Sequence, residues 1–146
     1  MDIEKKKEQE ENERKKAYLR RYLDAKRKQE LIETEIDELR IKRMTPSSLK
    51  QDGMPRGSNC GGDLSGYATQ LDELDRELKH QLCEKLRIRK EIVERIESMK
   101  DETESLVLRM RYIHGMKMYQ IADKIECEER TAYRIFKRAV KNIKIS

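Results

Sequence analysis

Glycine and proline are distributed very unevenly along this chain. Five of the six glycines and both prolines lie between positions 46 and 66, and the remaining glycine is Gly115. Because these two residue types disfavour the interior of a helix most strongly, the segments on either side can form long helices. We therefore expect helices over 1–44 and 67–100, separated by a flexible loop over 45–66.

Apolar residues in both long segments recur at spacings of mostly three and four, which is the pattern of a helix that packs along one face. The first stripe consists of Tyr18, Tyr22, Ala25, Ile32, Ile36 and Leu39, with the polar Gln29 within it. The second consists of Leu71, Leu74, Leu78, Leu82, Leu86, Ile88, Ile92, Val93, Ile96 and Met99. We expect an antiparallel, coiled-coil-like hairpin over 1–100 that dimerises, because two helices alone bury little area. The apolar pattern is nearly absent before Tyr18, so we expect the first turns to fray.

Composition limits the class of protein further. Charged residues make up 43% of the 146 residues, there is no Trp and only one Phe, and the net charge is +5. Such a chain favours an all-α fold with a small aliphatic core and leaves little room for an enzyme pocket. No apolar run is long enough to span a membrane, and the charged start lacks the apolar stretch of a signal peptide. Three scattered cysteines are typical of free thiols, so we expect a cytoplasmic protein.

The segment 101–146 has a different pattern, that of three short helices joined by turns. Asp101 followed by Glu104 is typical of a helix start in which each side chain caps the other's backbone, and Gly115 suits a left-handed helix end. The expected inward residues of the three helices are Leu106, Met110 and Ile113, then Met118, Ile121, Ala122 and Ile125, then Ala132, Ile135, Phe136, Ala139 and Ile143. Helices of this length, with the small Ala122 where two must approach closely, indicate a helix-turn-helix domain over 101–146.

The last helix, expected over about 128–143, carries a second stripe. Arg130, Arg134, Lys137 and Lys141 share one face, roughly opposite Ala132. Between residues 126 and 146 six basic residues outnumber three acidic ones, so positive charge is concentrated on a helix of the right size for the DNA major groove. The alternative interpretation is a solvated surface face with no partner.

Two stretches also carry a family resemblance. Residues 108–122, which read LRMRYIHGMKMYQIA, resemble the entry into region 4 of bacterial sigma factors, and residues 130–135 resemble the start of its DNA-reading helix. Residues 18–143 as a whole are similar to small phage and prophage proteins, with ArpU-type and RinA-type late-operon regulators as relatives. This resemblance implies a phage transcription regulator that binds double-stranded DNA.

The resemblance also implies roles for single residues. The base-reading positions would be Glu129, Arg130, Thr131, Tyr133 and Arg134, and the phosphate contacts would be Lys117, Lys137, Arg138 and Lys141. Two features depart from the family pattern. Glu126 stands where the turn usually has glycine, so that the turn cannot rely on a left-handed glycine, and Glu128 and Glu129 place two acids at the start of the reading helix.

Other chemistry is not indicated. His80 and Cys83 could supply two metal ligands on one helical turn, but zinc needs three or four and no second pair lies nearby, so we expect no metal, no cofactor and no enzyme activity. The predicted function is a homodimeric DNA-binding transcription regulator. Two alternatives remain: a small-terminase-like component of phage DNA packaging, and a protein that docks on bacterial RNA polymerase without reading DNA.

Overall fold

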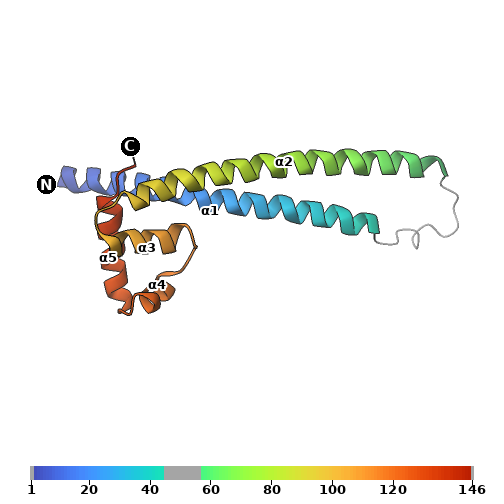
Figure 1. Ribbon diagram of the computed structural model, residues 1–146. Helices are drawn as coiled ribbons and strands as arrows, with labels where there is room; N and C mark the ends of the chain where they lie inside the picture. Colours follow the sequence, from blue (N-terminus) through green and yellow to red (C-terminus); the bar gives the residue numbers. More distant parts are fainter. Residues whose placement is uncertain (1, 45–56, 146) are drawn as a thin grey trace. The chain divides into compact units, whose positions relative to one another are not determined.

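The protein is all-α, as its composition predicts. The computed structural model describes residues 2–44 and 57–145, with the side chains of 57–65 left aside, and within these ranges it contains five helices and no strand. The helices are α1 (Asp2–Met44), α2 (Gly57–Glu97), α3 (Glu102–Tyr112), α4 (Met118–Lys124) and α5 (Glu129–Asn142) (Figure 1).

The expected helix over 1–44 is confirmed, but its expected frayed start and the expected start of the second helix are wrong. α1 is helical from Asp2 onward, although the lack of apolar residues before Tyr18 predicted frayed turns. The first turns gain partners instead, because Glu8 and Lys15 contact the end of α5. α2 begins at Gly57, ten residues earlier than expected. Glycine lowers helix propensity without blocking the helix as proline does, and Pro55 is the last proline of the chain. The rest of the expected loop, 45–56, lies outside the described residues.

Contacts divide the chain into two compact units. One unit contains residues 1–25 and 85–146, and the other contains residues 26–84. Both long helices contribute residues to both units. The first unit brings the start of α1 together with α3, α4 and α5, which lie more than 75 residues further along the chain.

The core of the first unit is aliphatic and comes from four helices. Its members include Leu19 of α1, Ile92 and Ile96 of α2, Leu108 of α3, and Val140 just before the end of α5, each at most 1% exposed. A smaller cluster joins α3, α4 and α5 through Val107, Met110, Met118, Ile121, Ala122 and Ala132. Phe136 packs against both clusters, so the one phenylalanine of the chain links them.

The predicted inward faces are mostly confirmed. Ala132, Ala139 and Ile143 are fully buried, and Ile135 and Phe136 are half-buried. Two predictions are wrong: Leu86 and Leu106 are 61% and 48% exposed. Their neighbours in the helical repeat, which are Ile88 in α2 and Val107 and Leu108 in α3, take the buried positions instead.

The ends of the short helices have well-defined caps. Asp101 Oδ1 accepts hydrogen bonds from the backbone N–H groups of Thr103 and Glu104 at 2.9 and 3.1 Å, which confirms the predicted N-cap. The predicted return bond from the Glu104 side chain is wrong, because that carboxylate bonds to α5. Gly115 has a φ of 64°, the left-handed conformation predicted for it.

The turn between α4 and α5 also passes through the left-handed region, but on a glutamate. Glu126 has a φ of 56°. The backbone N–H of Cys127 donates to the carbonyl of Ala122 at 3.0 Å, and that of Glu126 donates to Asp123 at 3.3 Å. These two bonds are the pattern of a Schellman helix end, in which glycine is the usual residue at the left-handed position. The turn therefore keeps its geometry without glycine.

The second unit has a simpler core. Ile32 and Ile36 of α1 are buried at 4% and 5% exposure. Arg43 of α1 lies over the ring of Tyr67 of α2, 5.6 Å from its centroid. Ile32 and Ile36 of the predicted stripe are therefore buried within a single chain.

Candidate nucleic-acid interface

α5 presents one buried and one exposed face. Its apolar residues pack against α3, α4 and the long helices, whereas Arg130, Arg134, Lys137 and Lys141 are all exposed, as predicted from their spacing. Ala122 of α4 and Ala132 of α5 belong to the same buried cluster, at 3% and 0% exposure. These small side chains let α4 and α5 approach closely, and the approach holds α5 with its basic face outward.

The N-terminal half of α5 is open to solvent. Its exposed residues include every residue that the resemblance assigns to base reading: Glu129, Arg130, Thr131, Tyr133 and Arg134. In the part of the chain that the structure describes, Arg130, Arg134 and Lys137 have no ion-pair partner. Tyr133 is 47% exposed beside them, which leaves an aromatic ring available to a partner.

Polar side chains in the last turns of α5, from Arg138 to Asn142, bind other parts of the protein. Arg138 donates from Nε to Oε1 of Glu104 at 2.6 Å, and the side-chain amide of Asn142 donates to both Glu104 oxygens at 3.1 Å. Lys141 lies 3.4 Å from Oε1 of Glu8 on α1. Of the four residues assigned to phosphate contacts, Arg138 and Lys141 thus have carboxylate partners in the protein itself.

The end of α5 is capped by a lysine that sequence reasoning missed. Lys15 of α1 is only 8% exposed, and its Nζ donates to the backbone carbonyl of Lys141 at 2.9 Å. The last four carbonyls of a helix lack partners within the helix, and a cation there also interacts favourably with the helix dipole. Lys15 belongs to a run of basic residues whose spacing carries no mark of burial.

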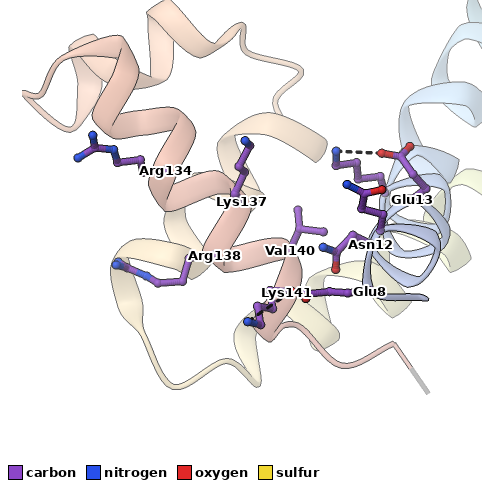
Figure 2. A pocket seen from close by; sticks show the side chains of 10 residues that line it. Glu8, Asn12, Glu13, Arg134, Lys137, Arg138, Val140 and Lys141 are labelled. Atoms are coloured by element: carbon purple, nitrogen blue, oxygen red, sulfur yellow. Dashed lines mark hydrogen bonds and ion pairs between the residues drawn. The ribbon is translucent and has the colours of Figure 1, made fainter. Parts of the chain in front are cut away.

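The two halves of the basic face meet at a groove between α1 and α5. The groove has a volume of about 690 Å³ and is lined by Glu8, Gln9, Asn12, Glu13, Lys16, Arg134, Lys137, Arg138, Val140 and Lys141. Figure 2 shows Glu8, Asn12 and Glu13 on α1 and Val140 and Lys141 on α5 across from them, with Lys137 above Val140 and Arg134 further from α1. Nζ of Lys16 lies 3.2 Å from Oε1 of Glu13 and 5.8 Å from the centre of the Phe136 ring.

The remaining assigned residue, Lys117, lies at the start of α4. It is exposed, and its backbone N–H donates to the side chain of Gln120 at 2.9 Å. This bond satisfies one of the backbone donors at the start of α4. The Lys117 side chain is therefore not needed to cap the helix.

Two tyrosines next to this region have perturbed acidity. Burial raises the pKa of the Tyr112 hydroxyl above its ordinary value of 10.0, against an opposing effect of Arg20 and Arg111. Burial, and then a hydrogen bond to Glu91, raise the pKa of Tyr18.

The described residues contain no group of three His, Cys, Asp or Glu side chains that could hold a metal ion. None of the described helices has the length and apolar character needed to cross a lipid bilayer.

Comparison with protein families places part of this chain in a known family. A family model described as "Protein of unknown function (DUF1492)" matches residues 62–144, more than half of the chain. The chain belongs to the DUF1492 family. The match starts within α2 and covers α3, α4 and α5, so the exposed basic face of α5 lies inside the DUF1492 region. No curated protein and no solved structure matches the chain.

Proposed function

We propose that this protein is a phage-type transcription regulator that binds double-stranded DNA through α5. In this proposal α4 and α5 form a helix-turn-helix, and α5 enters the major groove with its N-terminal half. The supporting observation is that Arg130, Arg134 and Lys137 are exposed on one face of a helix that follows a tight turn, and that none of the described residues forms an ion pair with them. Reading helices place residues near their N-terminus against base edges, and two of these three cations, Arg130 and Arg134, lie in the N-terminal half of α5.

The roles divide along α5. Arg130 and Arg134 can donate bidentate hydrogen bonds to guanine, and Thr131 and Tyr133 can contact neighbouring bases or sugars. Lys117 and Lys137 are exposed and can contact phosphates. Arg138 and Lys141 already have Glu104 and Glu8 as ion-pair partners. These two cations therefore contribute less to the free energy of DNA binding than their position suggests.

The proposed test begins with selection of bound 20-bp duplexes from a random pool, followed by fluorescence anisotropy on the best duplex and a scrambled one. Arg134→Ala should weaken binding to the selected duplex by about 1–3 kcal/mol and change binding to the scrambled duplex little. Arg40→Ala is the matched control, because Arg40 is an exposed arginine in the second unit. Equal affinities of the two variants for the selected duplex would contradict the proposal.

We also propose that α1 and α2 form one continuous antiparallel hairpin through which the protein dimerises. The stripe residues Ile32 and Ile36 are covered within the chain, so a dimer would use other surface. Leu31 and Ile41 of α1 are 63% and 62% exposed and could contribute to it. Light scattering at micromolar concentration should give the mass of two chains. A single-chain mass would contradict dimerisation, and a ring of eight or more would favour the DNA-packaging alternative.

The alternative of docking on RNA polymerase makes a different prediction. It requires that the protein bind no selected duplex alone and yet bind the polymerase. The exposed Leu106 of α3, at 48%, is an apolar contact available to such a partner. Pull-down with purified polymerase, with and without duplex, distinguishes the two modes.

A further inference from the structure

The groove between α1 and α5 contains more positive than negative charge. Five cationic side chains line it, of which three come with carboxylate partners: Lys16 with Glu13, Lys141 with Glu8, and Arg138 with Glu104. The other two, Arg134 and Lys137, have no ion-pair partner among the described residues. The groove therefore carries two positive charges that no carboxylate neutralises. A concave surface strengthens the electric field of such charges.

The groove also carries neutral hydrogen-bond donors. Gln9 and Asn12 of α1 line the wall that faces α5, and Figure 2 shows Asn12 between the two helices. Side-chain amides and cations are the groups that proteins place against phosphate oxygens. The lining is thus suited to an anion of the size of a phosphodiester and offers donors from both helices.

The ion pairs inside the groove can exchange. The side chains of Glu8, Glu13 and Lys141 are 48%, 69% and 63% exposed. Exposed pairs of this kind contribute little net free energy, because water and salt screen them. A phosphate can therefore replace Glu13 beside Lys16, or Glu8 beside Lys141, without a large loss of stability.

The groove continues the face proposed to read DNA. Arg130, Arg134 and Lys137 are one helical turn apart on the same side of α5, and the last two also line the groove. A duplex whose bases contact the start of α5 has its sugar–phosphate backbone along the sides of that helix. The backbone of the duplex can then reach the groove.

We propose that this groove binds a backbone phosphate of the duplex, so that α1 forms a second part of the DNA interface through Lys16, with Gln9 and Asn12. The inference rests on the proposed DNA binding of α5 and adds residues that neither the sequence pattern nor the resemblance assigned. Glu8 and Glu13 weaken binding at this site, because they compete with the phosphate for the same cations.

Salt-dependent binding tests the inference. Lys16→Gln should lower affinity for the selected and the scrambled duplex alike, by about three- to tenfold at 0.15 M KCl, and reduce the slope of log K against log salt by about 0.9. Glu13→Gln removes the competing charge and should raise both affinities by about two- to fivefold. Glu13 is largely exposed, so this variant keeps the fold, which circular dichroism verifies.

Two exposed residues of the first unit outside the groove supply matched controls, Lys100→Gln and Glu102→Gln. If the unmodified protein binds duplex with Arg134→Ala defective, while Lys16→Gln and Glu13→Gln behave like these controls, the groove is not a phosphate site and DNA binding by α5 stands. If the unmodified protein binds no duplex at all, both the groove assignment and the proposed function are overturned.

Discussion

Arg138 on α5 and Glu104 on α3 form an ion pair with an Nε–Oε1 distance of 2.6 Å, although the arginine side chain is 58% exposed and the glutamate side chain only 4%. A buried carboxylate needs partners for its charge, and Glu104 has two, Arg138 and Asn142. The pair joins α3 to α5, both of which lie within the DUF1492 region.

Glu104→Gln should destabilise the protein by about 1–3 kcal/mol, because it removes the negative charge that accepts hydrogen bonds from Arg138 and Asn142 of α5. Urea unfolding followed by circular dichroism measures the loss. Glu102→Gln is the control, since Glu102 lies in the same turn of α3 and is exposed. Equal unfolding midpoints of the two variants would show that the pair contributes nothing.

Glu126→Gly should stabilise the protein by about 0.5–1 kcal/mol, because a residue with a side chain at φ 56° is strained and glycine is not. Asp123→Gly is the control of opposite sign, because it lies within α4, where glycine has a lower helix propensity than aspartate. The same urea titration reports both. A loss in Glu126→Gly would mean that the turn relaxes around the glutamate.

Lys15→Met should destabilise the protein by about 1–2 kcal/mol, because it keeps most of the buried stem and removes the cation that caps α5. Lys28→Met removes an exposed lysine of the same helix and should change stability little. The comparison fails if both variants unfold at the same urea concentration as the unmodified protein. Amide hydrogen exchange should in addition show faster exchange in the last turn of α5 in Lys15→Met.

Stability should fall as pH rises above 10, through Tyr112. Its folded-state pKa is raised above 10.0, so the unfolded chain loses this proton first and deprotonation favours unfolding. Stability from this group is complete below pH 10 and is lost as pH rises through the folded-state pKa. The free energy of unfolding should therefore fall less between pH 9.5 and 11.5 in Tyr112→Phe than in the unmodified protein. The slopes of the free energy of unfolding against pH should differ by up to about 1.4 kcal/mol per pH unit. Tyr133→Phe, an exposed control, should follow the unmodified protein.

Local signals in the sequence predicted local structure well. The cap at Asp101, the left-handed Gly115, the buried Ile121 and Ala122, and the exposed stripe of α5 follow from residue type and helical spacing alone. These features depend on neighbours within a few turns, which is the range over which periodicity carries information.

The missed features depend on contacts between distant segments. Val140 is buried although it lies outside the predicted stripe of α5, because it faces the groove wall that α1 completes. The same applies to Lys15, whose partner is 126 residues away, and to Glu104, which a capping pattern explained wrongly. The spacing of apolar residues within one helix does not predict which of its faces a distant helix will cover.

The bond between Lys15 and the carbonyl of Lys141 also has a consequence for the order of folding during synthesis. A ribosome releases residue 15 long before residue 141, and domains assemble only when their distant contacts can form. The start of α1 therefore remains without its contacts to α5 until the ribosome has synthesised that last helix. Its many charges and few apolar residues suit that interval, because such a segment stays dissolved and does not aggregate with other nascent chains.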